Sequence, residues 1–226
     1  MLQKIFDHRQ EATLAASFRR KRFELLYTLV QELPCPVRIL DVGGEQRFWE
    51  MMGLVNTPDY QVVLLNIVPQ QVSWPNFRAL TGDATDLSRF ADHSFDVAFS
   101  NSVIEHLGSY PNQQRMAEEI RRVGQAYYVQ TPNLFFPLEP HFLVPLFQFF
   151  PFRLQVALLQ RFNLGWYHRM PSREQAEAHI RSHRLLRRTE LQALFPDGKL
   201  YLEKVCGLTK SFIVHRFPGS AAQGVQ

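Results

Sequence analysis

Residues 37–50 read VRILDVGGEQRFWE, and this stretch decides the fold. An apolar, β-branched run stops at an acidic residue and two glycines, and helix-compatible sequence follows, so we predict a buried strand, a tight turn and a helix start. Glycine suits the turn because the backbone must bend sharply and approach a ligand without a Cβ in the way. The unpaired N–H groups of the helix would face the same crevice, which favours a carboxylate or a phosphate. The stretch therefore predicts a nucleotide-binding corner.

The glycine pattern itself is incomplete. The dinucleotide fingerprint G-x-G-x-x-G needs a third glycine, whereas only Gly43 and Gly44 are present. Pyrophosphate binding is therefore not supported, and a dehydrogenase is disfavoured. Taken alone, the stretch also fits a core strand that ends in an ordinary glycine turn.

Composition limits the class of protein. With 226 residues, 46% hydrophobic and 20% charged, the chain suits one globular α/β domain with an insertion. The net charge of +4 is mild, and no long basic run supports a dedicated nucleic-acid binder, although Arg19–Arg22 could meet nucleic acid or an anionic membrane. Cys35 and Cys206 lie far apart without a partner histidine pattern. We therefore expect no disulfide and no metal site, and a reducing compartment.

Two stretches bear on localisation. Residues 1–8 carry charge where a signal peptide needs an apolar core, so we expect a cytoplasmic protein. Residues 142–159 are rich in Phe and Leu, but prolines and polar residues interrupt them. A spanning helix needs about 20 mostly apolar residues, so we expect no membrane span here.

Strands and helices are expected to alternate along the chain. Helical spacing of apolar residues predicts one or two helices within residues 1–33 and further helices near 111–123 and 189–195. Alternation of this kind implies parallel, right-handed βαβ units with ligands at the carboxyl ends of the strands. A short link between the last two strands predicts an antiparallel hairpin. The expected strands are 37–42, 61–67, 77–80, 95–100, 125–130, 199–206 and 210–215.

Residues 134–185 break this rhythm with an aromatic and Pro-rich segment. The segment is too long for a plain connection, so we expect a lid or a substrate-binding insertion. Its aromatic wall suits an apolar or aromatic acceptor, and it could touch a membrane surface beside the basic N-terminal helix. Packing of the same rings against the sheet or a second subunit is the alternative.

The order of three motifs resembles the class I S-adenosylmethionine-dependent methyltransferases, and in particular the type 11-like, small-molecule branch. The motifs are ILDVGG at 39–44, TGDA at 81–84 and FDVAFSNSVIEH at 95–106. The resemblance covers the chain from about residue 36 to residue 216. It implies an α/β, Rossmann-like, mostly parallel seven-stranded sheet with a C-terminal antiparallel hairpin, helices on both faces and a helical lid between strands 5 and 6. It also implies a single methyltransferase domain over residues 1–226, with an N-terminal helical segment at 1–35.

The resemblance implies S-adenosylmethionine as the cofactor and assigns residues to it. Asp41 would lie near the methionyl ammonium, where a negative charge complements the positive amino group and sulfonium. Asp83 would accept a hydrogen bond from the adenine amino group, and Ala84 would donate its backbone N–H to the ring edge. The implied cofactor-binding residues are Asp41, Gly43, Gly44, Asn66, Ile67, Asp83, Ala84, Asn101 and Ser102.

Two positions depart from the family pattern. Glu45 stands where the pattern D-x-G-x-G has its second glycine, so its side chain must point away from the cofactor or the loop must change shape. Asn66 stands where an acidic residue usually accepts both ribose hydroxyls, and an amide can accept one hydrogen bond and donate another. A chain that kept the fold and lost the activity would show the same departures.

Histidines near the expected acceptor are candidate general bases. Methyl transfer is an in-line displacement that mainly needs alignment, and an oxygen or nitrogen nucleophile can also need a proton removed. His106 follows the fourth strand and His141 begins the insertion, so we predict these two as catalytic residues, with the pair Tyr167 and His168 as weaker candidates. Structural or solvent-facing histidines are the alternative interpretation.

The sequence therefore predicts a methyltransferase that acts on a small acceptor, apolar or lipid-like. An RNA or protein methyltransferase is the alternative within enzymes, but no Asn-Pro-Pro-aromatic motif follows the fourth strand. A cofactor-binding or scaffold protein with a degenerate site is the alternative outside enzymes.

Overall fold

One mixed sheet organises the chain, for which a computed structural model describes residues 14–218. The seven strands lie in the order β3-β2-β1-β4-β5-β7-β6. Strands β1 to β5 are parallel, and β7 pairs antiparallel with both β5 and β6. The expected sheet, including its C-terminal hairpin, is confirmed. The strands are β1 (Val37–Val42), β2 (Tyr60–Asn66), β3 (Phe77–Thr81), β4 (Phe95–Asn101), β5 (Gly124–Pro132), β6 (Lys199–Val205) and β7 (Leu208–Arg216).

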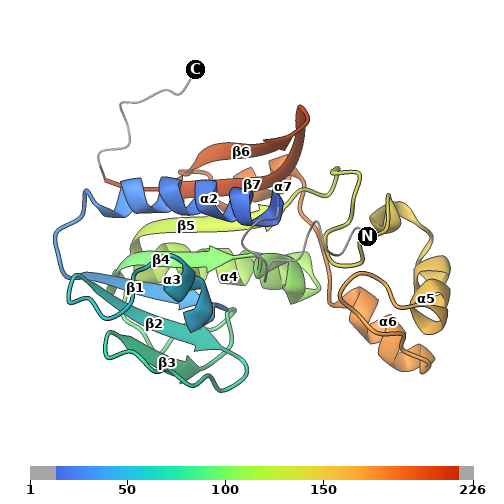
Figure 1. Cartoon of the computed structure of the whole chain (residues 1–226), viewed down its shortest axis with the longest axis horizontal. Helices are drawn as coiled ribbons and strands as arrows, with labels where there is room; N and C mark the ends of the chain where they lie inside the picture. Colours follow the sequence, from blue (N-terminus) through green and yellow to red (C-terminus); the bar gives the residue numbers. More distant parts are fainter. Residues whose placement is uncertain (1–13, 219–226) are drawn as a thin grey trace.

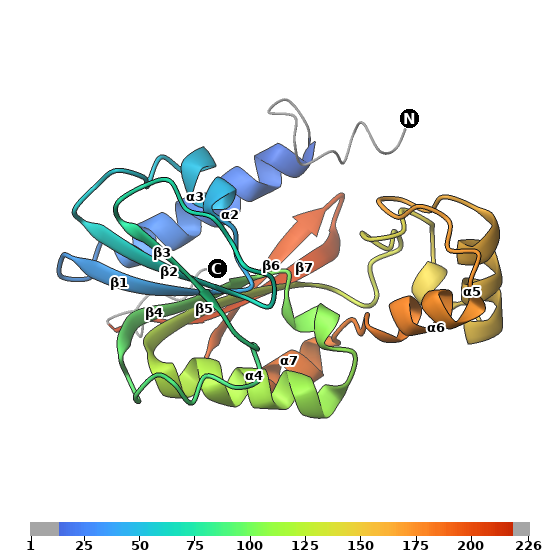
Figure 2. The same cartoon turned by 90° about the horizontal axis from the view of Figure 1, so that it is seen from below.

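Helices cover both faces of this sheet, as Figures 1 and 2 show. Helices α2 and α3 lie on one face, and α4 and α7 lie on the other. The N-terminal helical prediction is seen as α2, while residues 1–13 lie outside the described residues. The helices are α2 (Leu14–Val30), α3 (Gln46–Met51), α4 (Tyr110–Val123), α5 (Phe152–Arg161), α6 (Arg173–Arg181) and α7 (Arg188–Leu194), with 3-10 turns η1 (Ile104–Leu107) and η2 (Phe147–Phe149).

The alternation of side chains along β1 explains the two cores. Leu40 and Val42 belong to the core shared with α4 and α7, whereas Ile39 belongs to the core shared with α2 and α3. All three side chains are buried because a parallel strand with helices on both faces has no solvent side. Fully burying an aliphatic side chain stabilises the fold by about 1.5–3 kcal/mol. The continuous apolar run in the sequence has this physical cause.

The connection after β4 is short and well capped. The Ser109 hydroxyl accepts a hydrogen bond from the Asn112 N–H at 3.3 Å, and Pro111 occupies the first turn of α4, where no N–H is needed. This cap sets where α4 begins, so η1 stays at the carboxyl end of β4. That position places Glu105 and His106 at the edge of the sheet where ligands of parallel α/β folds bind.

Residues 134–187 form a lobe beyond the carboxyl ends of the strands (Figures 1 and 2). Its helices α5 and α6 enclose a small core that includes Phe142, Phe147 and Leu159. Within residues 14–218, no helix is both long and apolar enough to cross a membrane.

Candidate active site

The corner after β1 is shaped by its two glycines. Gly43 has a φ of +82°, and a Cβ on it would lie 2.5 Å from a methyl carbon of Val103. A Cβ on Gly44 would lie 1.8 Å from the Asp41 carboxylate. Glu45 has an ordinary extended conformation, with φ at −129°, and is exposed. The departure at position 45 therefore needs no glycine, because the positive φ belongs to Gly43.

Asp41 lies beneath this corner and is 1% exposed. The Trp49 indole N–H donates to its Oδ2 at 2.7 Å, while its Oδ1 is buried and has no hydrogen-bond partner among residues 14–218. Burial raises the pKa of Asp41 to about 7, although the Trp49 hydrogen bond opposes the shift. A buried carboxylate oxygen without a partner is a ready acceptor for a cationic or N–H group of a ligand.

The ends of β2 and β3 carry the next predicted residues. The Asn66 side chain donates to the Gly43 carbonyl at 3.3 Å, which ties β2 to the corner. Ile67 is 74% exposed, an unusual position for a large apolar side chain next to a sheet edge. Asp83 is exposed, and its Oδ1 accepts bonds from the N–H and hydroxyl of Thr85. Ala84 is buried beneath this turn.

The side chains predicted at the end of β4 form hydrogen bonds with other residues of the protein. The Asn101 Oδ1 accepts a hydrogen bond from Arg22 at 3.1 Å, and Arg22 also pairs with Glu203. Ser102, with φ at +58°, donates its hydroxyl to Gln130 at 2.7 Å. One arginine of the basic cluster at 19–22 therefore anchors α2 over the sheet instead of facing a polyanion.

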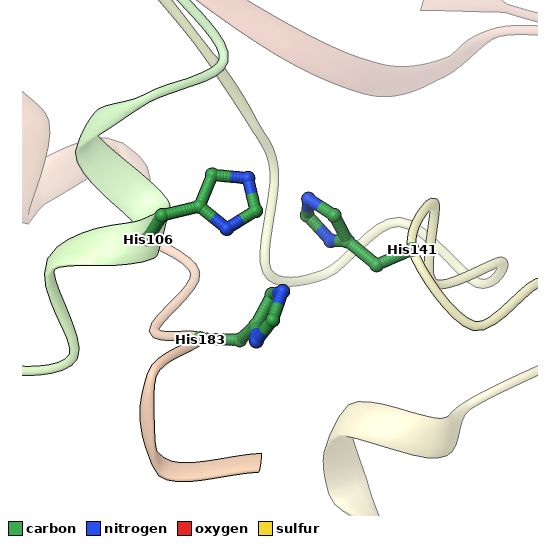
Figure 3. Close-up of side chains that lie close together, drawn as sticks. All are labelled: His106, His141 and His183. Atoms are coloured by element: carbon green, nitrogen blue, oxygen red, sulfur yellow. The ribbon is translucent and has the colours of Figure 1, made fainter. Parts of the chain in front are cut away.

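A cluster of three histidines lies on the other side of η1. Figure 3 shows that the rings of His106, His141 and His183 point into one shared space. Their ring centroids lie 4.7–4.9 Å apart, and one nitrogen from each lies within 4.8 Å of the others. The structure therefore brings the two predicted histidines together and adds a third from the loop after α6.

Two buried glutamates surround His141. The Glu139 carboxylate accepts a hydrogen bond from the His141 Nδ1 at 2.8 Å and is 3% exposed. Burial lowers the pKa of His141, but the hydrogen bond to Glu139 and the charges of Glu139 and Glu105 outweigh that effect and raise it. Glu105 is fully buried, and burial raises its pKa to about 7. One Glu105 oxygen accepts the Thr131 hydroxyl, and the other has no hydrogen-bond partner within the described residues.

The other members of the cluster favour the neutral imidazole. Burial lowers the pKa of His183 to about 4, and partial desolvation with repulsion from His141 and His183 lowers the pKa of His106. The Tyr167 hydroxyl lies 3.0 Å from the His183 Nε2, so Tyr167 belongs to the edge of the cluster. The structure does not bring its predicted partner His168 into the group, because that side chain is exposed.

A cleft of about 600 Å³ adjoins the histidines between the sheet domain and the lobe. Glu139 and His183 line it, so it shares a wall with the cluster. Its other walls combine an apolar and a basic set of side chains: Leu134, Phe142, Phe147, Phe152, Ile180 and Leu185 are apolar, and Arg181, Arg184 and Arg187 are basic.

Comparison with known proteins bears on the fold that holds this site. Residues 40–126 match the family model described as a methyltransferase domain. A solved S-adenosylmethionine-dependent methyltransferase from Methanosarcina mazei is similar over 84% of this chain and 94% of its own, with a TM-score of 0.53 at 14% identity. The CurJ carbon methyltransferase is similar over 95% of this chain and 56% of its own, with a TM-score of 0.55 at 12% identity.

Sequence relatives cover less. Two uncharacterized proteins from Mycobacterium tuberculosis, strains CDC 1551 and H37Rv, are 39% identical over 57 residues, or 25% of this chain. The match spans 20% of the length of these relatives. The fold is that of the class I S-adenosylmethionine-dependent methyltransferases, so the resemblance carried by the three motifs is confirmed. More particularly, residues 40–126 carry the methyltransferase domain match of the type 11 family.

Sequence reasoning missed His183 and Trp49. His183 is distant in sequence from His106 and His141, and no spacing rule joins the three. Trp49 lies within the quoted stretch at 37–50, but its hydrogen bond to Asp41 depends on how its helix folds back over β1. A signal for Trp49 existed, because a buried indole N–H generally needs an acceptor.

Proposed function

We propose that this protein transfers a methyl group from S-adenosylmethionine to a small acceptor, apolar or lipid-like. The observation that carries the proposal is the cradle at the end of β1. Gly44 carries no Cβ, which would strike the Asp41 carboxylate, and within residues 14–218 one buried oxygen of Asp41 has no hydrogen-bond partner. These two features fit a cationic ligand that passes close to the backbone.

The cofactor would lie across the carboxyl ends of β1, β2 and β3. The unpaired oxygen of Asp41 suits its ammonium group, and Asn66 would meet the ribose. Ile67 offers exposed apolar surface that an adenine ring would cover, and Asp83 offers a carboxylate to the adenine amino group. Gly43, Ala84, Asn101 and Ser102 complete the proposed set. When bound, S-adenosylmethionine supplies a methyl group on a positively charged sulfur.

The acceptor would enter through the cleft that separates the sheet domain from the lobe. A volume of about 600 Å³ lies within the range of small-molecule sites. The apolar walls suit an acceptor with an apolar body, and Arg181 and Arg187 suit an anionic group, whereas Arg184 already pairs with Glu190 of the same wall. Contact of the lobe with a membrane surface is part of this proposal, supported by exposed apolar side chains at Phe135, Leu146, Phe149, Leu154, Phe162 and Trp166.

His106 and His141 are the proposed catalytic residues on the acceptor side. Alignment of nucleophile and methyl group lowers the barrier by on the order of 7 kcal/mol or more, and removal of a proton by an imidazole adds about 10²- to 10⁴-fold in rate. Glu139 fixes the ring of His141 through its Nδ1, which leaves Nε2 to face the acceptor. The lobe would exclude water from this space.

Titration calorimetry and methyl labelling test the proposal together. S-adenosylmethionine should bind one equivalent per chain, and Asp41→Ala and Asp83→Ala should each weaken it, whereas NADH should not bind. Incubation with methyl-labelled cofactor and a cell extract should label a small-molecule fraction. Unchanged affinity in both variants would remove the site assignment. Binding without transfer to any fraction would favour the scaffold alternative, and label in RNA or protein would favour a macromolecular acceptor.

A further inference from the structure

Three imidazoles that converge on one space form a ligand set typical of a metal ion. His106 comes from η1, His141 from the loop after β5 and His183 from the loop after α6 (Figure 3). We propose that His106, His141 and His183 hold one divalent transition-metal ion of the Zn²⁺ type, with a fourth position open.

The spacing of the rings is close to that of a coordinated set. Imidazole nitrogens about 2.1 Å from one tetrahedral cation lie about 3.4 Å from one another. In the structure one nitrogen from each ring lies within 4.8 Å of the other two. Small inward rotations of the rings therefore complete the geometry.

Hydrogen bonds to the Nδ1 atoms of two of the rings also favour a metal site. The Nδ1 of His141 bonds to the Glu139 carboxylate at 2.8 Å, and the Nδ1 of His183 lies 2.9 Å from the His179 carbonyl oxygen. A metal-bound histidine almost always donates its other N–H to a carboxylate or a backbone carbonyl. Both rings are thereby held in the tautomer that leaves Nε2 for the cation.

The ligand chemistry selects the ion. Three neutral nitrogens suit Zn²⁺ and related transition metals, whereas Mg²⁺ and Ca²⁺ require oxygen ligands. Three protein ligands leave a tetrahedral cation one open position, as in catalytic zinc sites. Because His183 also lines the cleft, that position would take water or an oxygen of the acceptor. The role of the ion at the acceptor rests on the proposed function, whereas its binding does not. With the ion bound, His106 and His141 would be ligands, so they would act on the acceptor through the ion and not as free general bases.

Substitution of Tyr167 should not weaken metal binding, unlike substitution of a ligand. Its hydroxyl lies 3.0 Å from the Nε2 of His183, which is the atom that would bind the metal ion. Metal binding must break this contact, so removal of the hydroxyl should not weaken the site. Tyr167→Phe should bind Zn²⁺ at least as tightly as the parent chain.

The experiment uses the full chain without a polyhistidine tag, stripped with a chelator and titrated with Zn²⁺ against a chromophoric competitor. One equivalent should bind, and Co²⁺ loading should give the intense visible absorption of a tetrahedral nitrogen site. His106→Ala, His141→Ala and His183→Ala should each lose stoichiometric binding. Glu139→Gln should weaken Zn²⁺ by about 10- to 100-fold. The matched control is His93→Asn, an exposed histidine at the opposite end of β4, which should bind Zn²⁺ unchanged.

The outcomes separate the two proposals. Circular dichroism and calorimetry with S-adenosylmethionine on the same samples report whether each variant is folded. Cofactor binding without stoichiometric Zn²⁺ uptake by the parent chain would overturn the metal site and leave the proposed function standing. Zn²⁺ uptake without cofactor binding would overturn the proposed function and leave the metal site standing. Equal losses in His93→Asn and the cluster variants would also overturn the metal site.

Discussion

The glycine corner after β1 and the histidine cluster lie at the same edge of one sheet, yet they are assembled differently. Residues 41–45 shape the corner through backbone conformation, and the neighbouring ends of β2 and β3 extend it. The histidines come from three segments, two of which flank the helices of the lobe. The corner therefore depends on the parallel sheet and on how α3 folds back over β1, whereas the cluster depends on how the lobe packs against η1.

Electrostatics separate the two regions as well. Asp41 is a single buried carboxyl with one unpaired oxygen, and a cationic ligand would favour its ionised form. The cluster holds a carboxylate–imidazole pair beside two imidazoles whose pKa values are lowered. We expect variants of the corner to change cofactor affinity and variants of the cluster to change turnover.

His141→Ala should produce the largest effect. It removes the imidazole that Glu139 orients, and loss of such a group costs about 10²- to 10⁴-fold in rate. Affinity for S-adenosylmethionine should stay within about twofold, since His141 is not among the residues proposed to hold the cofactor. Single-turnover methyl transfer and calorimetry measure the two quantities, with His93→Asn as the control. A large loss of cofactor affinity in His141→Ala would mean that the histidine cluster also contributes to cofactor binding.

Gly44→Ala should act on the corner alone. Its Cβ would lie 1.8 Å from the Asp41 carboxylate, so the loop or the carboxylate must move. Overpacking of this kind costs about 1–3 kcal/mol, which corresponds to an affinity loss of about 5- to 150-fold if it falls on the bound state. Calorimetry with S-adenosylmethionine measures it. Gly53→Asn is the control, because Gly53 also has a positive φ but nothing lies within 4 Å of its Cβ position. Equal affinity in Gly44→Ala and the parent chain would refute the cradle.

The pH dependence of cofactor binding isolates Asp41. Its pKa of about 7 in the folded protein exceeds the ordinary value, so this group stabilises the fold at low pH and that stability is lost as pH rises through about 7. A positively charged cofactor favours the ionised form. Affinity should therefore rise about tenfold between about pH 6 and about pH 8, where ionisation grows from about a tenth to about nine tenths.

Asp41→Asn provides the comparison for that titration. Asparagine keeps an acceptor for the Trp49 N–H but cannot ionise. Its affinity profile should be flatter than that of the parent chain over the same pH range, and Glu105, whose pKa is also about 7, remains in both proteins. Identical profiles would show that Asp41 does not meet the cationic part of the cofactor.

Asn66→Asp should have the smallest effect. A carboxylate can accept both ribose hydroxyls, which favours tighter binding, but it cannot donate to the Gly43 carbonyl. Since that bond is long, at 3.3 Å, we expect cofactor affinity to rise by about two- to fivefold. Calorimetry decides the sign, and a loss beyond about tenfold would mean that Asn66 serves the loop and does not face the ribose.

Much of the fold could be read from local pattern. The strand predicted at 37–42 is observed with the same bounds, and helix α7 differs from its prediction by one residue at each end. Strands buried on both faces leave continuous apolar runs, and Ser109 and Pro111 mark a helix start by local hydrogen bonding. Such features depend on neighbours in sequence, so no tertiary knowledge was needed.

Contacts of the site between residues far apart in the chain could not be predicted from the sequence. Glu45 departs from the family's glycine pattern, but its φ of −129° shows that the turn needs no glycine at this position. Asn101 and Ser102 were assigned to the cofactor, but their pairing with Arg22 and Gln130 comes from α2 and β5. Side-chain partners from other elements cannot be inferred from the strand that carries a residue.

By itself, the sequence determined the parallel sheet, its order of motifs and the glycine corner, because burial on both faces and positive φ leave a local imprint. Only the tertiary structure decided that His106, His141 and His183 meet, that Glu139 stands behind one of them and that Trp49 covers Asp41. Those contacts join segments far apart in the chain, and their geometry follows from packing of the lobe and helices against the sheet, which no local pattern encodes.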